Sequence, residues 1–293
     1  MGFACGDALG APVEFESRES IATRYPDGLR EFTSGGWMDV VPGELTDDSR
    51  MMLDLAETLA MPGTVDLEDL GRRFVAWADE GPKDIGNTTR LAIDLLRSGV
   101  AWDRAGQQAL ETMGSGRAAS NGSVMRCAPV AVRFHTDPDQ VRTVSLDTSR
   151  ITHAEPRCAW SCVAINQAIA HFLNIGSLDS LIAAAVVGIE NAEVVSAILA
   201  VREMQSRDLQ GSGYVLNSVQ IALWTVLNCR DFEEAVVAAV SIGDDTDTNA
   251  AVAGSLAGAV YGYSEIPDRW KTQVHQHERL IDLADRLLDR GIA

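Results

Sequence analysis

Carboxylate and hydroxyl side chains crowd into two short stretches of this 293-residue chain. Residues 43–49 (GELTDDS) and residues 243–249 (GDDTDTN) each lie directly before a segment whose apolar residues have helical spacing. Capping of a helix start by Thr, Asp or Ser explains one or two such residues per helix. It does not explain this density of acidic groups, so the two stretches are candidate cation sites.

The ligand types indicate which cation would suit these stretches. Asp244, Asp245 and Asp247 would repel one another in a partly buried site unless a cation offsets their charge. Neither stretch contains His or Cys, and an oxygen-only set suits a hard ion such as Mg²⁺ or Mn²⁺ better than zinc. Two clusters at two helix starts allow two ions about 3.5–4 Å apart. Helix capping without any metal is the alternative for these residues alone.

Three other polar motifs are less specific when each is taken singly. Residues 84–89 (DIGNTT) begin another helical segment and suit an N-cap. Residues 120–129 (SNGSVMRCAP) contain small residues whose backbone N–H groups could face an anion, with Arg126 adding charge. An ordinary Asn-Gly turn has the same composition. His153 stands alone near a helix start, where a histidine is more often a satisfied structural group than a ligand contact.

Helices must position these motifs, because strand signals are scarce. Helical apolar spacing occurs in residues 49–60, 66–79, 88–98, 158–173, 181–187, 192–204, 214–227, 232–240, 249–261 and 270–288, and residues 158–173 are apolar nearly all round, as in a buried central helix. Short strand signals occur only near residues 13–16 and 31–33. No linker, repeat or low-complexity segment divides the chain. We therefore predict an all-α protein that forms one compact domain over residues 1–293.

Composition excludes several classes of protein. The chain carries 24 Lys and Arg against 42 Asp and Glu, and the formal net charge of −18 disfavours nucleic acid and anionic lipid as general partners. The longest apolar run, residues 181–189, is much shorter than the roughly 20 residues of a membrane helix. The N-terminus lacks the pattern of a secretion signal. Five cysteines without paired spacing predict reduced, buried thiols in a cytoplasmic protein.

Taken in order, the motifs resemble those of the ADP-ribosylglycohydrolase family. The matching segments are residues 6–10 (GDALG) followed by Glu14-Phe15, then 45–49 (LTDDS), 84–89 (DIGNTT), 121–126 (NGSVMR), 152–153 (TH), 243–250 (GDDTDTNA) and the closing segment 266–270 (IPDRW). One such motif is unspecific, whereas six in order are specific, and they cover Gly2 to about Trp270. The resemblance implies a compact, single-domain orthogonal helical bundle with a binuclear Mg²⁺ or Mn²⁺ site. It also implies an enzyme that hydrolyses the bond between ADP-ribose and a protein side chain.

The resemblance implies a role for each matching position. Glu14, on a short mobile segment beside the metals, and Asp84, close to the reacting sugar, are the candidate catalytic carboxylates, and either can be the acid or the base. The implied metal ligands are Thr46, Asp47, Asp48, Asp245, Asp247 and Thr248. The implied substrate-binding residues, along the diphosphate, ribose and adenine, are Asn87, Asn121, Gly122, Ser123, Met125, His153 and Tyr214.

Two departures from the family pattern accompany the match. The chain begins almost inside the first motif, so we expect the first helix to be shorter than usual or its start to be trimmed. Ser120 and Asp244 stand where many relatives have glycine. Ser120 is expected to narrow the phosphate loop, whereas Asp244 adds a carboxylate without an assigned role.

The expected function is metal-dependent release of ADP-ribose from ADP-ribosylated proteins, with N-linked arginine as the first candidate linkage. O-linked serine, another ADP-ribose adduct and a non-catalytic ADP-ribose-binding relative are the alternatives. An isoprenoid synthase is a different class of acidic, all-α, Mg²⁺-dependent enzyme, but its DDxxD motif needs a third Asp that residues 47–51 (DDSRM) lack. Neither a membrane nor nucleic acid is an expected partner.

Overall fold

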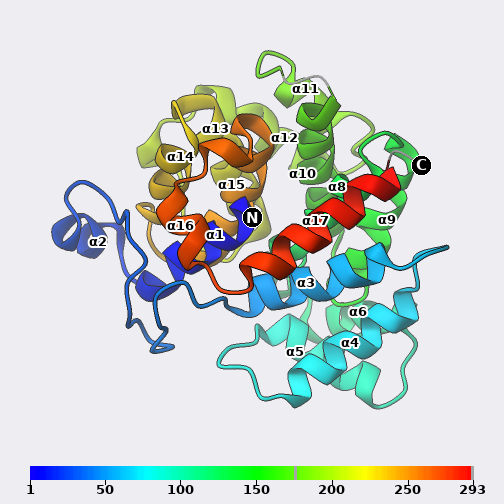
Figure 1. Ribbon diagram of the computed structural model, residues 1–293. Coiled ribbons are helices and arrows are strands. Elements are labelled where there is room, and N and C mark those ends of the chain that lie inside the picture. Colours follow the sequence, from blue (N-terminus) through cyan, green and yellow to red (C-terminus); the bar gives the residue numbers. More distant parts are fainter. Residues whose placement is uncertain (175–176, 292–293) are drawn as a thin grey trace.

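The computed structural model describes residues 1–174 and 177–291, which form α-helices joined by turns and short 3₁₀ segments (Figure 1). The all-α prediction is confirmed. The two strand signals are wrong, because the extended pairings within these ranges are isolated bridges, Gly35 with Val40 and Ser120 with Tyr214. Residues 13–16 instead finish the 3₁₀ turn η1 (Ala11–Val13), and residues 31–33 lie in a loop. Neither segment has a second strand with which to form a sheet.

Helices of two to five turns make up most of the protein. They are α1 (Gly2–Gly10), α3 (Asp47–Ala60), α4 (Leu67–Asp79), α5 (Asn87–Arg97), α6 (Trp102–Met113), α9 (Pro138–Arg150), α10 (Pro156–Asn174), α12 (Ala192–Ala200), α13 (Val215–Asn228), α14 (Phe232–Val240), α15 (Thr246–Tyr261) and α17 (His277–Gly291). Shorter helices are α2 (Arg18–Arg24), α7 (Ser115–Ala118), α8 (Pro129–Phe134), α11 (Leu181–Val186) and α16 (Asp268–Gln273).

Each segment with helical spacing contains a helix, with two differences in length. Residues 270–288 are divided between α16 and α17, because Gln276 adopts a left-handed backbone with φ 63°. Helix α12 ends at Ala200 and continues as a 3₁₀ turn (Val201–Glu203). Several helices, α1 among them, were not predicted. Except for Asp7, α1 is apolar or glycine on every side, so its sequence has no polar face to reveal a period.

Helix α1 is buried along its whole length and crosses α15 at backbone contact (Figure 1). Gly2, Gly6 and Gly10 recur every four residues and therefore share one face of the helix. A Cβ on Gly6 would lie 2.0 Å from the carbonyl oxygen of Ala250, and one on Gly254 would lie 2.3 Å from the carbonyl oxygen of Gly2. Only glycine permits this approach, and it holds α1 directly against the first turns of α15.

One hydrophobic cluster extends from Phe3 in α1 to Leu287 in α17. Helix α10 belongs to it and buries residues on all sides, as its nearly continuous apolar sequence predicts. Helix α17 packs on α3 and α8, whereas α4, α5 and α6 gather below α3 in the view of Figure 1. A continuous core of this kind is what a single domain requires, and the single-domain assignment stays a prediction.

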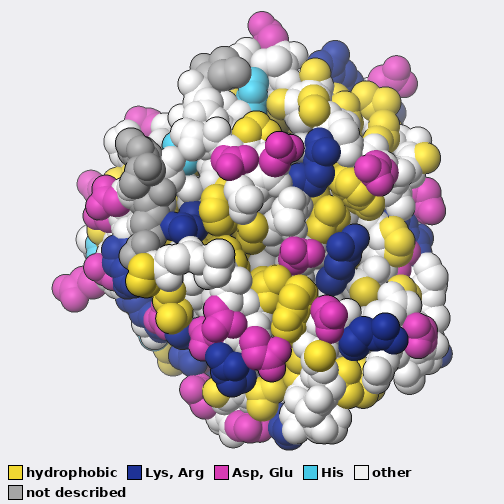
Figure 2. All heavy atoms as spheres, turned by 90° about the vertical axis from the view of Figure 1, so that its right-hand side faces the viewer, with side chains coloured by type: hydrophobic (Ala, Val, Ile, Leu, Met, Phe, Trp, Pro, Cys, Tyr) yellow, Lys and Arg dark blue, Asp and Glu magenta, His cyan; other side chains and the backbone are white. Residues whose placement is uncertain are grey.

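All five cysteines are free. Four of them are buried as predicted, but Cys229 is only half-buried, so the prediction of burial is wrong for that thiol. No helix in residues 1–174 and 177–291 is both long and apolar enough to cross a membrane. On the face shown in Figure 2, acidic and basic side chains are interspersed, with apolar atoms between them.

The contact between α1 and α15 predicts the effect of Gly6→Ala. The new methyl group would meet the Ala250 carbonyl oxygen at 2.0 Å, so the two helices must move apart. Overpacking of this kind costs about 1–3 kcal/mol, and we expect a loss near the upper end of that range in urea denaturation. Gly116→Ala in α7 is the control, since its Cβ meets nothing within 4 Å. Equal urea midpoints for the two variants would contradict the backbone contact.

Candidate active site

Helix α1 ties together the starts of α3 and α15. The Asp7 carboxylate is fully buried and accepts hydrogen bonds from the backbone N–H groups of Thr46 (3.1 Å) and Ser49 (3.3 Å). One turn further along α1, at its C-terminus, the Thr246 hydroxyl donates to the carbonyl oxygen of Gly10 at 2.8 Å. The sequence does not assign this role to Asp7. The available signal was one acidic residue within an otherwise apolar helix.

The two acidic stretches, about 200 residues apart in sequence, meet at Asp48. Thr248 Oγ1, from the second stretch, donates to Asp48 Oδ1 in the first stretch at 3.3 Å. Thr46 caps α3 by accepting a hydrogen bond from the Asp48 N–H at 3.3 Å. Asp48 Oδ2 is buried and has no hydrogen-bond partner among the described residues. A buried carboxylate oxygen without a donor is costly unless a cation satisfies it.

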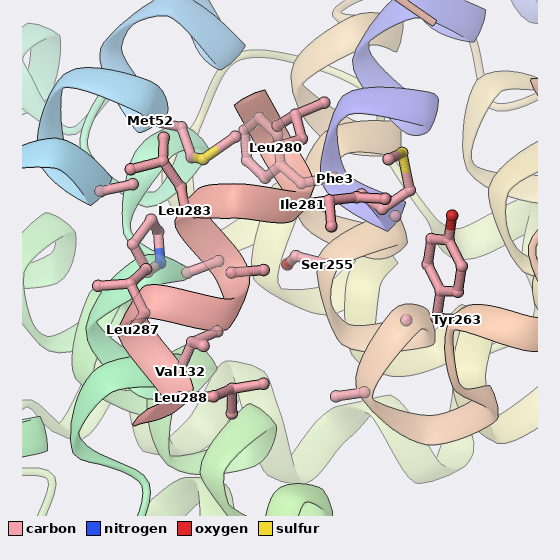
Figure 3. Close-up of a pocket in the computed structure, with 18 of the residues that line it drawn as sticks. Phe3, Met52, Val132, Ser255, Tyr263, Leu280, Ile281, Leu283, Leu287 and Leu288 are labelled. Atoms are coloured by element: carbon pink, nitrogen blue, oxygen red, sulfur yellow. The ribbon is translucent and has the colours of Figure 1, made fainter. Parts of the chain in front are cut away.

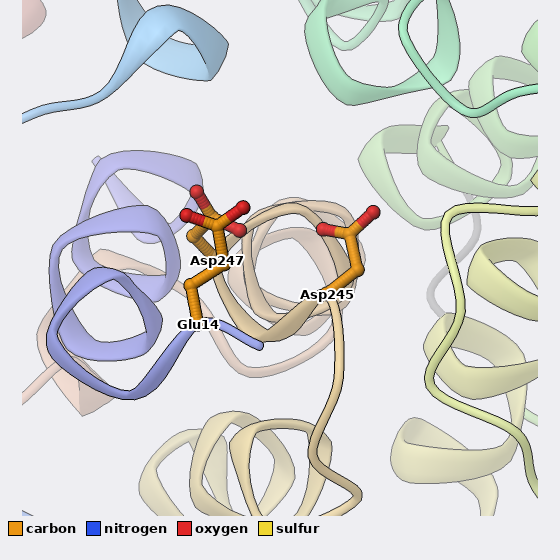
Figure 4. Close-up of side chains that lie close together, drawn as sticks. All are labelled: Glu14, Asp245 and Asp247. Atoms are coloured by element: carbon orange, nitrogen blue, oxygen red, sulfur yellow. The ribbon is translucent and has the colours of Figure 1, made fainter. Parts of the chain in front are cut away.

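Three carboxylates of the second stretch and of the segment after α1 lie close together. Glu14, Asp245 and Asp247 each offer an oxygen, and these oxygens all lie within 4.8 Å of one another. In Figure 4, Glu14 approaches from the end of η1 while Asp245 and Asp247 project from the start of α15, with their carboxylates on the same side. Trp37 donates its indole N–H to Glu14 Oε2 at 2.7 Å. The sequence does not single out Trp37.

Burial and mutual repulsion raise the pKa values of these carboxyl groups. Burial, with added repulsion from Asp245, Asp84 and Asp47, raises the pKa of Glu14 to about 8. Burial, together with repulsion from Asp84, raises the pKa of Asp47 to about 8. The pKa values of Asp48 and Asp247 are raised well above their usual range, and burial is again the largest cause.

Asp84 lies close to the first acidic stretch. It is half-buried in the loop before α5 and, with Thr46 and Asp47, lines a cavity of about 260 Å³. Asn87 is exposed in the first turn of α5. The structure thus brings Asp84 next to Thr46 and Asp47, two of the predicted metal ligands. Asn87 follows three residues later, as the first residue of α5.

Asn121 connects the loop of residues 120–126 to the acidic cluster. Its side-chain amide donates to Asp245 Oδ2 at 2.9 Å and to Ser218 Oγ at 3.0 Å. Its backbone N–H donates to the carbonyl oxygen of Gly213 at 3.0 Å, which sets Tyr214 beside the same loop. The next residue, Gly122, has no room for a side chain, because a Cβ would lie 2.7 Å from the His153 ring.

Arg126 does not face an anion, so that expectation is wrong. Its guanidinium is buried, donates to the carbonyl oxygen of Gly122 and to Thr152 Oγ1 (2.6 Å), and lies 4.8 Å from the Phe74 ring centroid. Its acceptors are thus one carbonyl of the loop and, outside the loop, the Thr152 hydroxyl and the Thr148 carbonyl oxygen. Arg126 therefore shapes the loop from inside the core.

The His153 side chain also forms a hydrogen bond with this loop. Its ring is 1% exposed, with Nε2 2.9 Å from Ser120 Oγ and Nδ1 2.8 Å from Thr152 Oγ1. Burial lowers the pKa of His153 to about 3, so the ring is neutral. Ser120 thus bonds to His153, whereas it was expected to narrow the phosphate loop. A contact between His153 and adenine stays a prediction.

The remaining substrate candidates lie around the same loop. Ser123 and Met125 are buried in and beside the 3₁₀ turn η2 (Val124–Arg126). Tyr214 is half-buried at the start of α13, and the Arg157 guanidinium lies 5.6 Å from its ring centroid. Their roles in binding stay predictions.

Asp244 acts through its backbone. Its side chain is exposed and its φ is 67°, a left-handed conformation that glycine also adopts readily. Its carbonyl oxygen accepts from the Phe15 N–H at 2.6 Å, and its N–H donates to the Glu16 carbonyl oxygen at 2.7 Å. Through these two backbone hydrogen bonds, Asp244 holds the segment that contains Glu14 against the start of α15.

An apolar cavity lies away from the acidic cluster. It has a volume of about 510 Å³ and an almost wholly apolar lining from α1, α15 and α17, including Phe3, Leu283 and Leu287 (Figure 3). It shares no lining residue with the acidic cluster. Of the two cavities, the larger one thus lies away from the carboxylates, and the smaller one is lined by Asp47 and Asp84.

Fold and site together define a class: an all-helical protein whose helix starts gather an all-oxygen acidic cluster able to hold a cation. A family model described as ADP-ribosylglycohydrolase matches residues 1–292. The chain belongs to the ADP-ribosylglycohydrolase family, whose members are enzymes. The family resemblance of the motifs is therefore confirmed.

Relatives and a solved structure agree with this membership. The chain is 31% identical to ADP-ribosylarginine hydrolase Tri1 of Serratia proteamaculans, with 98% of this chain and 77% of that protein covered. It is 32% identical to the ADP-ribosyl-dinitrogen reductase glycohydrolase of Rhodospirillum rubrum, with 94% of this chain and 88% of that protein covered. A solved structure described as an ADP-ribosylglycohydrolase-related protein complex matches with a TM-score of 0.83 and 31% identity, covering 99% of this chain and 95% of the other.

The raised pKa values predict that the metal-free protein is more stable in mild acid. Unfolded Glu and Asp titrate at about 4, whereas the folded-state pKa values of Glu14 and Asp47 are about 8. Between these limits the folded state binds more protons than the unfolded state, so stability falls as pH rises. In chelator, we expect the urea midpoint to rise when the pH is lowered from about 8 to about 5.5.

Asp47→Asn removes one of these titrating groups and should flatten that pH dependence in chelator. Saturating Mg²⁺ or Mn²⁺ should flatten or reverse it in the wild-type protein, because cations bind the deprotonated carboxylates. A wild-type urea midpoint in chelator that stays constant, or that increases toward pH 8, would contradict the raised pKa values.

Proposed function

We propose that the chain is a divalent-cation-dependent hydrolase that releases ADP-ribose from N-linked arginine in ADP-ribosylated proteins. Two observations carry the proposal: the cluster of Glu14, Asp245 and Asp247, and the buried oxygen of Asp48 that has no hydrogen-bond partner among the described residues. Similarity to proteins named as an ADP-ribosylarginine hydrolase and as a dinitrogen reductase glycohydrolase favours arginine as the linkage.

The donor chemistry supports a hard divalent cation. All candidate donors are oxygen atoms, Asp48 Oδ2 lacks a donor, and the crowded carboxylates need positive charge nearby. We assign two Mg²⁺ or Mn²⁺ ions to Thr46, Asp47, Asp48, Asp245, Asp247 and Thr248. Such ions supply positive charge that orients ribose hydroxyl groups and makes water more acidic.

The chain's own carboxylates are proposed to handle the proton. Cleavage at the anomeric carbon of the ribose builds positive charge on the sugar, which nearby carboxylates stabilise. Glu14 or Asp84 donates a proton to the departing nitrogen, and the other steers the attacking water and accepts the proton that the water loses.

The ADP-ribose is proposed to lie along the loop that Asn121 joins to Asp245. This placement would set the ribose beside the cluster and carry the diphosphate and adenine toward Tyr214. The contacts that we assign to substrate come from Asn87, Asn121, Gly122, Ser123, Met125, His153 and Tyr214.

Three broader assignments accompany the proposal. One continuous core supports a single domain over residues 1–293, of which the last two lie outside the described residues. The free thiols support a cytoplasmic location. The net charge of −18 supports protein substrates over nucleic acid, and neither a membrane nor nucleic acid is proposed as a partner.

Asp245→Asn tests the metal site against its neighbour Asp244→Asn. Even outer-shell partners of metal ligands contribute about 10–100-fold to metal affinity, so we expect Asp245→Asn to lose more than about 100-fold in Mn²⁺ affinity by calorimetry. ADP-ribose release should fall with it, while circular dichroism stays helical. Asp244→Asn should behave as wild type, because its side chain is exposed and Asn accepts the left-handed backbone. Metal affinity and activity retained in Asp245→Asn would exclude this site.

A panel of peptides with defined linkage tests the reaction. We expect free ADP-ribose from arginine-linked peptides in the presence of Mg²⁺ or Mn²⁺, and none in chelator. Release from serine-linked peptides alone would replace the proposal with the O-linked alternative. Binding of ADP-ribose without release from any peptide would identify a non-catalytic relative.

A further inference from the structure

Two large aromatic side chains are exposed directly beside the acidic cluster. Phe15 and Trp37 are 62% and 49% exposed, and their ring centroids lie 5.6 Å apart with an interplanar angle of 36°. Trp37 donates to Glu14 Oε2 at 2.7 Å, and Glu14 lies with Asp245 and Asp247 (Figure 4). We call Phe15 and Trp37 the aromatic platform.

The backbone holds the platform outward. Phe15 has φ 64°, a left-handed conformation that a bulky residue rarely adopts, and its N–H is held by the Asp244 carbonyl oxygen. Trp37 follows Gly36, whose φ is 72° and whose Cβ would lie 2.9 Å from the Pro12 carbonyl oxygen. Strain of this kind collects at functional sites. A fold that needed the two rings only for packing would bury them.

Two aromatic faces next to carboxylates form the environment that a planar cation prefers. A cation over an aromatic ring is attracted by the electrons of the ring face. A guanidinium is planar, keeps its charge, stacks on aromatic rings and pairs with carboxylates. Glu14, which is not among the proposed metal ligands, supplies the carboxylate that touches the Trp37 ring.

We propose that the aromatic platform of Phe15 and Trp37, together with the Glu14 carboxylate, receives the guanidinium of the ADP-ribosylated arginine. This inference rests on the proposed function and names the residues that select its leaving group. The Trp37 ring contacts the guanidinium, while its N–H positions Glu14. A serine leaving group has neither charge nor plane and gains nothing from the platform.

Leucine substitutions of the platform test this inference by steady-state kinetics with an arginine-linked peptide. We expect Phe15→Leu and Trp37→Leu each to raise KM about tenfold, which corresponds to about 1.4 kcal/mol. Competitive inhibition by methylguanidine should weaken by a similar factor. The affinity of Phe15→Leu for free ADP-ribose, which lacks the leaving group, should stay unchanged. Trp37→Phe keeps a ring but loses the N–H, so it should lower kcat while KM stays near the wild-type value.

Tyr263→Leu is the matched control, because it removes a 48% exposed ring that lines the apolar cavity instead of the cluster. It should leave KM and methylguanidine inhibition unchanged. Unchanged values in Phe15→Leu and Trp37→Leu would overturn the inference and leave the proposed function intact. An equal loss of ADP-ribose affinity would overturn it too, because the rings would then contact ADP-ribose. Wild-type protein that releases nothing from arginine-linked peptides would overturn both.

Discussion

The acidic site depends on one nine-residue helix that is fixed on both sides. Glycines on one face of α1 bring it to backbone contact with α15, and the Asp7 carboxylate binds the first backbone N–H groups of α3. The distance between two helix starts far apart in sequence is therefore set by main-chain contact on the α15 side and by one fully buried side chain, Asp7, on the α3 side. This is how the Thr248 hydroxyl comes to lie within hydrogen-bond distance of Asp48.

The same arrangement concentrates negative charge where water is scarce. Few donors reach the cluster: Asn121 binds Asp245, Trp37 binds Glu14, and Thr248 binds Asp48. Burial is the largest cause of every raised pKa in the group. The surrounding helices must therefore hold the carboxylates together against their repulsion. Such a site is destabilising until a cation binds, and that makes ligand binding and folding stability interdependent.

The order of the motifs predicts the family, and the helical spacing predicts most helices, because both are local patterns. Contacts between distant segments leave no such pattern. Nothing around Asp7 shows that its carboxylate caps α3, and nothing around Trp37 shows that its indole meets Glu14. Arg126 was misassigned for the same reason. A cation beside small residues suggests an anion site, whereas the buried Arg126 guanidinium donates to the Gly122 carbonyl oxygen and to the Thr152 hydroxyl.

The backbone conformation of Asp244 could not be predicted from the types of the residues around it. Its charge drew attention in the sequence, but its side chain points to solvent and its left-handed φ determines its role. The strand signal near residues 13–16 fails similarly, because Phe15 is left-handed and pairs with a single residue of another loop. Apolar alternation cannot distinguish such a pair from a strand.

The two backbone hydrogen bonds between residues 15–16 and Asp244 couple the Glu14 segment to the start of α15. Glu14 lies next to two main-chain bonds, from the Phe15 N–H to Asp244 and from the Asp244 N–H to Glu16. An outward swing of the Glu14 segment has to break both bonds, and it pulls on the first turn of α15 as it does so. Movement of Glu14 and displacement of the α15 start, which carries Asp245 and Asp247, are thus one concerted motion.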